Sequence, residues 1–196
     1  MKKYLINELF YSIQGEGIRA GTANVFVRFS KCNLQCNVKE HGFDCDTDFS
    51  KSVPMNSQDI INKCEELGGE CNWIVFTGGE PALQLDENLI KEAKDRGYSI
   101  AIETNGTVML PGGIDWICVS PKNLNIKQLT ANELKYVINA DSKLPEPIIY
   151  ADFNLLSPAH FNGMILPGAM DRCIELCKDN PQWRLSVQQH KQWGIR

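Results

Sequence analysis

Runs of residues that favour β-strands alternate with runs that favour helices, and this alternation limits the possible folds more than any other feature. Strands are predicted at 24–30, 73–76, 98–102, 115–119, 136–139, 153–156 and 183–187. Helices are predicted from Ser57, as N-cap, to about Leu67, from Pro81 to about Arg96, and over 169–178. Such alternation is typical of an α/β fold with a mostly parallel sheet.

The length of the chain decides which parallel fold fits. A closed barrel of eight strand–helix pairs typically needs about 250 residues, whereas this chain has 196. We therefore expect an incomplete TIM-like barrel with about six parallel strands and three main helices. Because no linker, repeat or low-complexity segment interrupts the pattern, a single domain over residues 1–196 is expected.

The composition limits both the class of ligand that the protein can bind and the cellular compartment in which we expect it. The formal net charge is −4 and no run of Lys or Arg occurs, which argues against nucleic acid as a partner and favours a small-molecule substrate. The start, MKKYLINELFYSIQGEG, lacks a cleavage site, and no stretch approaches the roughly 18 apolar residues that cross a bilayer. A cytoplasmic protein without a membrane partner is expected, so its eight cysteines should be reduced and serve metal binding, catalysis or packing.

Polar and glycine-rich clusters follow the predicted strands. They lie at 31–47, 77–81, 103–106, 120–122 and 157–160. Since the carboxyl ends of parallel strands meet at one edge of a sheet, where ligands bind, these five clusters predict an active site at that edge.

Three cysteines in the first cluster have the spacing Cys32-x3-Cys36-x8-Cys45. Three thiolates can ligate three irons of a cubane cluster and leave the fourth iron open, whereas clusters that only carry electrons normally have four cysteine ligands. The spacing alone also fits a zinc site with His41 as fourth ligand, or unrelated thiols. The other five cysteines, at 64, 71, 118, 173 and 177, are interpreted as core thiols.

Two motifs together resemble the radical S-adenosylmethionine enzymes. Their usual Cys-x3-Cys-x2-Cys motif follows the first strand, and a Gly-Gly-Glu-Pro turn follows the second. Here Cys32 and Cys36 have the expected spacing and Gly78-Gly79-Glu80-Pro81 follows a strand, while Cys45 comes six residues late and Phe43 is displaced by one position. A longer loop is tolerable, because doubling a flexible loop costs only about 0.6 kcal/mol.

Within that superfamily the chain resembles the 7-carboxy-7-deazaguanine synthase family along nearly its whole length. The matching segments are 13–17, Arg28, the three cysteines, 46–47, 77–81, 103–107, 120–122 and the tail 189–196. The resemblance implies conversion of 6-carboxy-5,6,7,8-tetrahydropterin to 7-carboxy-7-deazaguanine with loss of ammonia. It also implies a 4Fe–4S cluster, S-adenosylmethionine, Mg²⁺, an electron donor such as flavodoxin or ferredoxin, and a homodimer.

The same resemblance assigns roles to individual residues. It implies substrate contacts by Ile13, Gln14, Gly15, Glu16, Arg28, Thr77, His190 and the terminal Arg196. It implies cofactor contacts by Gly78, Gly79, Glu80, Ser120, Pro121, Lys122 and Ser157. It implies that Cys32, Cys36 and Cys45 hold the cluster and that Thr47 binds magnesium.

The residues support part of these assignments independently. An arginine within an otherwise apolar strand, as at position 28, requires either an acidic ligand or a buried Asp or Glu partner. Structural explanations remain open for the other positions, as turn residues at strand ends or a surface histidine. The alternative functions are a glycyl-radical-enzyme activating enzyme, which shares the Cys-x3-Cys opening and a Gln-Gly-Glu-Gly stretch, and a zinc-stabilised binding domain.

Overall fold

One large, mostly parallel β-sheet organises the fold. The structure is a computed structural model that describes residues 2–43, 45 and 51–196. Within these residues nine strands form the sheet, in the order β11-β8-β7-β6-β5-β4-β2-β1-β3. Its strands are β1 (Tyr4–Ile13), β2 (Ala23–Phe29), β3 (Val53–Met55), β4 (Trp73–Gly78), β5 (Ser99–Thr104), β6 (Trp116–Val119), β7 (Thr130–Ile138), β8 (Tyr150–Pro158) and β11 (Trp183–Leu185).

The sheet is an open barrel wall. From β2 to β11 the seven strands β2, β4, β5, β6, β7, β8 and β11 run parallel, while β1 and β3 pair antiparallel at one edge. Because β11 and β3 lie at opposite ends of the strand order, the sheet does not close on itself. The expected incomplete barrel is confirmed, with seven parallel strands rather than about six.

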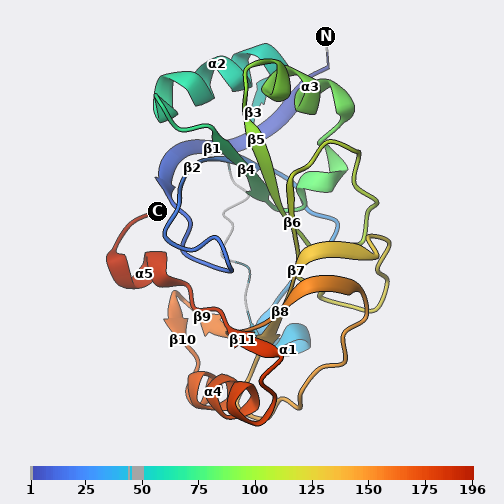
Figure 1. The fold of residues 1–196 in the computed structure, drawn as a ribbon, viewed down its shortest axis with the longest axis vertical. Helices are drawn as coiled ribbons and strands as arrows, with labels where there is room; N and C mark the ends of the chain where they lie inside the picture. The colour runs from blue at the N-terminus through green and yellow to red at the C-terminus, as the bar shows by residue number, and fades with distance from the viewer. Residues whose placement is uncertain (1, 44, 46–50) are drawn as a thin grey trace.

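Three longer helices cover the outside of this wall. They are α2 (Ser57–Gly68), α3 (Glu87–Asp95) and α4 (Ala169–Asp179), beside the short α1 (Val38–His41), α5 (Gln189–Trp193) and the 3₁₀ turn η1 (Pro81–Leu83). Helices α2 and α3 lie together at one end of the molecule and α4 lies at the other (Figure 1). Plain loops join β5 to β6, β6 to β7 and β7 to β8, which explains why the strands outnumber the helices. None of the helices in the described ranges has the length and apolar character needed to cross a bilayer.

Side-chain caps determine where the helices begin. Asn56 accepts a hydrogen bond from the Asp59 amide at 2.8 Å, so it is the N-cap of α2 and the prediction of Ser57 was wrong by one residue. Asp86 likewise caps α3 through the Leu89 amide, so this helix begins at Glu87 and not at Pro81. Helix α2 ends at Gly68, one residue after the predicted end at about Leu67.

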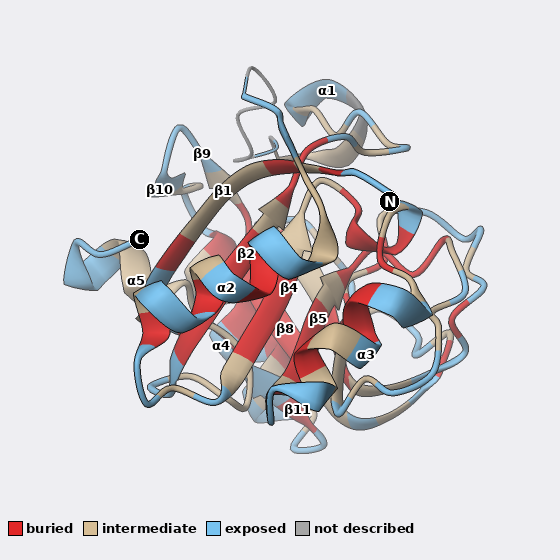
Figure 2. Cartoon of the chain, turned by 90° about the horizontal axis from the view of Figure 1, so that it is seen from above, coloured by how far each residue is buried: buried red, intermediate tan, exposed pale blue. Residues whose placement is uncertain are grey.

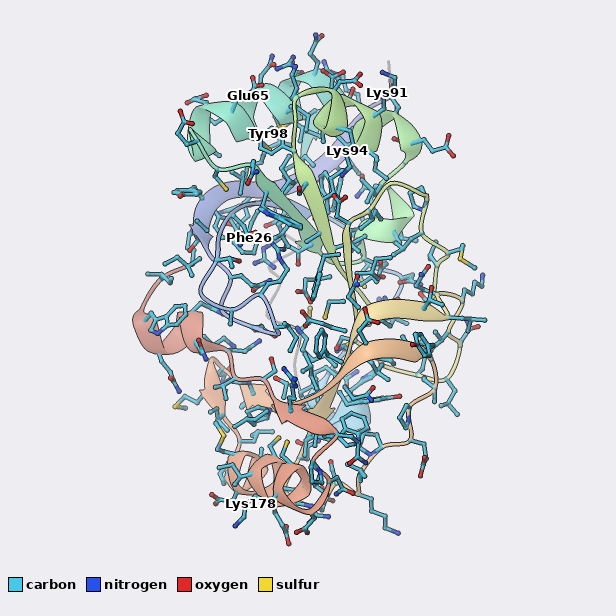
Figure 3. The ribbon with its side chains drawn as sticks, in the orientation of Figure 1. Phe26, Glu65, Lys91, Lys94, Tyr98 and Lys178 are labelled. Carbon is cyan, nitrogen blue, oxygen red and sulfur yellow. The ribbon has the colours of Figure 1, made fainter. Side chains whose placement is uncertain are left out.

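Successive side chains of each strand point to opposite sides of the sheet, which gives the sheet a packed outer face and a more polar inner face. In β2 the side chains of Val25, Val27 and Phe29 pack under the helices in the main hydrophobic cluster, and Figure 2 shows buried strands beneath the exposed outer surfaces of α2 and α3. Phe26 and Arg28 point to the opposite, inner side, where they line a cavity. Figure 3 shows Phe26 on this inner side, far from the surface charges Glu65, Lys91 and Lys94 of the helices and Lys178 of α4.

Several elements were missed or shortened by the sequence prediction. Strand β1, the edge strand β3 and the hairpin β9 (His160–Phe161) with β10 (Met164–Ile165) were not predicted. Strands β7 and β8 have nine residues each, whereas four were predicted for each. Buried charges such as Glu133 and Lys135 within β7 obscured its apolar pattern, because charged residues rarely occupy buried strand positions.

Candidate active site

A cavity of about 1500 Å³ opens at the carboxyl edge of the parallel sheet. All five polar clusters contribute to its wall, through residues that include Cys32, Thr77, Glu103, Ser120 and Ser157. The predicted convergence of these clusters at one edge of the sheet is therefore confirmed. Single-ligand pockets usually enclose about 300–1000 Å³, so this cavity has room for two small molecules.

The segment after β1 and the C-terminal segment close the cavity on the side away from the cysteine loop. Gly15 accepts a hydrogen bond from the Gln189 amide at 3.0 Å, and a Cβ on Gly15 would lie 2.2 Å from the His190 Nδ1. This close approach requires glycine at position 15. It also brings His190, 175 positions later in the chain, to the cavity wall beside Gln14 and Glu16.

Cys32, Cys36 and Cys45 line this same cavity. Cys32 and Cys36 are half-buried and Cys45 is exposed. Burial raises the pKa of the Cys32 and Cys36 thiols, and the neighbouring cysteines raise both values further. Three thiolates at this place would therefore repel one another, and a bound cation would relieve that repulsion.

The donor set fits a cubane cluster. Within residues 2–43, 45 and 51–196, no three His, Cys, Asp or Glu side chains gather closely enough to hold one metal ion, and His41 instead accepts a hydrogen bond from the Asn37 amide through Nδ1. In a cubane cluster each thiolate binds a different iron, so the sulfurs stand wider apart than around one zinc. Cys32, Cys36 and Cys45 line one cavity, so three thiols are available there for such a cluster.

The Gly78–Glu80 turn forms the rim beside the cysteine loop. Gly78 has a φ of +117°, and a Cβ there would lie 2.2 Å from the Phe29 carbonyl oxygen, so only glycine fits. Gly78 and Gly79 line the cavity. Glu80 does not: its carboxylate is fully buried behind the rim and accepts hydrogen bonds from Thr104 Oγ1 at 2.6 Å and the Asn105 amide at 2.7 Å.

A buried ion network crosses the inner face of the sheet. Lys135, in the middle of β7 and 7% exposed, lies 2.7 Å from Glu16 Oε2 and 3.1 Å from Glu103 Oε2. Gln188 donates to the other oxygen of Glu16 at 2.8 Å, and Gln14 donates to Glu103 at 3.3 Å. Burial alone would raise the pKa of Glu16, but the charge and hydrogen bond of Lys135 outweigh it and lower the value to about 2.

Arg28 also lies on the cavity wall. Its Nε donates to Glu8 Oε1 at 2.9 Å, across the β1–β2 pair, and its side chain is 24% exposed. Glu8 also pairs with Arg196 at 3.2 Å. The acidic partner that the sequence required for a buried arginine is therefore Glu8, and Arg28 still faces the cavity.

The structure brings most of the predicted site residues together. Every predicted substrate residue lines the cavity, namely Ile13, Gln14, Gly15, Glu16, Arg28, Thr77, His190 and Arg196, as do Gly78, Gly79, Ser120, Lys122 and Ser157. Two predicted cofactor residues do not line it: Glu80 is buried behind the rim, and Pro121 lines a neighbouring cavity of about 440 Å³. Thr47 lies outside the described residues.

Two cavity residues, Lys135 and Gln188, were missed at the sequence level. The sequence also did not identify Glu8, which pairs with Arg28 but is not among the residues that line the cavity. Lys135 has only a short signal in the sequence, because Glu133 and Lys135 alternate with Leu134 and Tyr136 as one polar strand face would. Glu8 and Gln188 carry no such pattern; their position depends on how β1 and the tail fold against the sheet.

The fold and the site together define a class. An incomplete parallel α/β barrel with three thiols and a Gly-Gly-Glu-Pro turn at its carboxyl edge is the architecture of radical S-adenosylmethionine enzymes. The solved structure of QueE from Escherichia coli has this fold, with a TM-score of 0.71 at 24% identity over 94% of this chain and 93% of that one.

Similarity in sequence then identifies the family. Relatives named 7-carboxy-7-deazaguanine synthase are 39% identical in Caulobacter vibrioides and 38% identical in Bradyrhizobium diazoefficiens, each over 98% of this chain and 99% of the relative. No protein-family model matches the chain. The chain belongs to the 7-carboxy-7-deazaguanine synthase family.

Proposed function

We propose that the protein converts 6-carboxy-5,6,7,8-tetrahydropterin to 7-carboxy-7-deazaguanine and ammonia. The atoms of the substrate equal those of the two products, so the ring contraction needs no net oxidant. The family and the fold support this reaction. A single observation connects it with the site: three thiols, the carboxylates of Glu16 and Glu103, and the guanidinium of Arg28 line one cavity.

The thiols of Cys32, Cys36 and Cys45 would hold a 4Fe–4S cluster, and S-adenosylmethionine would bind beside it. When bound, these groups supply the radical chemistry that removes a hydrogen atom from the substrate. The backbone of Gly78 and Gly79 lets a ligand approach closely because no Cβ projects from it. Three further side chains on the same wall, Ser120, Lys122 and Ser157, offer two hydroxyls and an ammonium for the ribose and carboxylate of that cofactor.

Charged and polar side chains of the cavity wall would orient the pterin. The contact of Arg28 with Glu8 uses Nε, and a guanidinium has further donors in its terminal nitrogens that suit a substrate carboxylate. Gln14 and Glu16 can complement the donors and acceptors of the pyrimidine edge. His190 and Arg196 on the tail, and Thr77, complete the enclosure of the ligand. We retain Thr47 as the proposed magnesium ligand, with Mg²⁺ bridging to substrate oxygens.

The proposed reaction also requires an electron donor that reduces the cluster. Cys45 is exposed, which supports reduction of the cluster from the surface by a one-electron donor such as flavodoxin or ferredoxin. We also propose a single domain over residues 1–196, a homodimer, and activity in the cytoplasm.

The reaction is tested with anaerobically reconstituted protein, dithionite, S-adenosylmethionine, Mg²⁺ and 6-carboxy-5,6,7,8-tetrahydropterin. Mass spectrometry should detect 7-carboxy-7-deazaguanine, and ammonia should form in equal amount. Transfer of a glycyl radical to a partner protein with no pterin turnover would instead support the activating-enzyme alternative. A colourless, zinc-loaded and inactive protein would support the zinc-domain alternative.

A further inference from the structure

Three side chains connect the cysteine loop to the end of β5 through a closed hydrogen-bond ring. Asn33 Nδ2 donates to Thr107 Oγ1 at 2.8 Å, and the Thr107 hydroxyl donates to Asn105 Oδ1 at 2.7 Å. Asn105 Nδ2 donates back to Asn33 Oδ1 at 3.1 Å, which completes the ring. Hydrogen bonds that follow one another in this way polarise and strengthen each other, so the ring fixes the orientation of all three side chains.

The hydrogen-bond ring is anchored on buried residues. Asn105 and Thr107 are 8% and 4% exposed, and the Thr107 amide also donates to Asn105 Oδ1 at 2.9 Å. The Asn105 amide in turn donates to the buried carboxylate of Glu80 at 2.7 Å. Asn33, by contrast, is an exposed residue of the cysteine loop. The ring therefore holds an exposed loop against a rigid part of the rim.

Contacts on both sides of Cys32 hold the backbone there. Lys31, directly before Cys32, has a φ of +77°, a conformation that residues other than glycine rarely adopt and that persists only where the surroundings fix it. The Lys31 carbonyl accepts a hydrogen bond from the Glu80 amide at 3.0 Å. On the other side of Cys32, the side chain of Asn33 is held by the hydrogen-bond ring.

The held segment also places two polar groups beside the Cys32 sulfur. The Leu34 amide donates to Cys32 Sγ at 3.4 Å, and Asn33 Oδ1 lies 4.0 Å from the same sulfur. An N–H group that points at a sulfur ligand stabilises the reduced, more negative state of an iron–sulfur cluster and so raises its reduction potential. A carbonyl oxygen beside the sulfur has the opposite effect, because its partial charge is negative.

We propose that Asn33 is a positioning residue for Cys32: through the hydrogen-bond ring it holds the segment Cys32–Leu34 so that the Leu34 amide points at the sulfur and raises the reduction potential of the cluster. The inference depends on the proposed function, because it assumes that Cys32 ligates a 4Fe–4S cluster. That cluster accepts one electron from the external donor, so a higher potential lets a given donor reduce a larger share of the enzyme.

The test is an anaerobic redox titration of the reconstituted protein with dithionite and mediators, in which electron paramagnetic resonance follows the reduced cluster. Wild type is compared with Asn33→Ala, with Thr107→Val, which removes the ring hydroxyl and keeps a similar shape, and with Thr107→Ser, which keeps the hydroxyl. Iron content and far-UV circular dichroism verify that each variant is loaded and folded.

We expect the equilibrium constant for one-electron reduction to fall about tenfold in both Asn33→Ala and Thr107→Val, the effect of losing one hydrogen bond to a charged group. A tenfold fall equals a shift of about 59 mV toward negative potential. The potential of Thr107→Ser should equal that of wild type, because its hydroxyl can still close the ring.

The sign of the shift separates positioning from simple support of the fold. If the segment kept its shape without the ring, Asn33→Ala would only remove the oxygen beside the sulfur, and the potential would stay constant or rise; either result would overturn the inference. An equal fall in Thr107→Ser would also overturn it, since the hydroxyl would not be the cause.

Should Asn33→Ala fail to fold or to take up iron, the two Thr107 variants decide. A fall in Thr107→Val alone supports the inference, and an unchanged potential in Thr107→Val overturns it. A wild type that takes up no 4Fe–4S cluster would refute the proposed function itself, which differs from a loaded wild type whose potential the ring does not affect.

Discussion

The buried carboxylate of Glu80 allows a quantitative prediction about the rim. Its Oε1 accepts from Thr104 Oγ1 at 2.6 Å and the Ala82 amide at 3.0 Å, and its Oε2 accepts from the Asn105 amide at 2.7 Å. The Thr104 hydroxyl donates to Glu80, because an ionised carboxylate can only accept, while the hydroxyl oxygen accepts from the Gly106 amide. Three donors therefore point at one carboxylate.

Glu80→Gln keeps the shape and replaces one acceptor by an NH₂ group. The best arrangement leaves the new oxygen toward Thr104 and Ala82 and places NH₂ against the Asn105 amide, where two donors face each other in a buried site. One unsatisfied donor costs about 1–3 kcal/mol, and two charge-assisted bonds weaken by about 1 kcal/mol each. Because burial also raises the pKa of Glu80, relief of the buried charge offsets part of this loss, and we expect a net destabilisation of about 3 kcal/mol.

Urea unfolding followed by tryptophan fluorescence measures this loss. With a slope of about 2 kcal/mol per molar urea, the midpoint should fall by about 1.5 M. The control Glu70→Gln changes an exposed residue and should have the same urea midpoint as wild type. A Glu80→Gln midpoint equal to that of wild type, together with weaker S-adenosylmethionine binding, would refute the bracing role and support direct contact with the cofactor.

Three further predictions concern Gly78 at the rim and two charged residues of the cavity wall, Arg28 and Glu16. Gly78→Ala places a Cβ 2.2 Å from the Phe29 carbonyl oxygen at a φ of +117°, so the urea midpoint should fall by the equivalent of about 3 kcal/mol; an unchanged midpoint would show that the turn relaxes. Arg28→Ala should weaken 6-carboxypterin binding by about 10-fold to 100-fold without loss of iron, whereas loss of iron would mean that Arg28 supports the cluster loop. Because the pKa of Glu16 is lowered from 4.5 to about 2, its stabilisation is complete above about pH 4.5 and disappears toward pH 2. The stability of wild type relative to Glu16→Gln, measured by urea unfolding, should therefore rise by about 3 kcal/mol over that interval, and a constant difference would contradict the charge pairing with Lys135.

The sequence predicted the elements whose patterns are local. The apolar runs around positions 24–30 and 73–76 became the central strands β2 and β4, and the polar clusters after them reached one edge because parallel strands all end there. Arg28 predicted an acidic partner or ligand, because a charged side chain in an otherwise apolar strand is costly to bury without one.

Other parts of the site depend on tertiary contacts that a local pattern does not contain. Glu8 pairs with Arg28 only because β1 runs antiparallel to β2 in a register that places the two side by side. Gln188 reaches Glu16 because the tail packs against Gly15, a contact between residues far apart in the chain. Glu80 was predicted at the cofactor, and its burial behind the rim follows from the three donors that β5 and η1 direct at it.

The central claim is that Cys32, Cys36 and Cys45 hold one 4Fe–4S cluster at the open rim of the sheet. Iron and acid-labile sulfide content after anaerobic reconstitution tests it directly, for wild type, Cys45→Ala and the buried core control Cys173→Ala. We predict about four iron and four sulfide per chain, with the absorbance of a cubane cluster, in wild type and Cys173→Ala, and loss of both in Cys45→Ala. A full cluster in Cys45→Ala, or a colourless wild type with one zinc per chain, would contradict the claim.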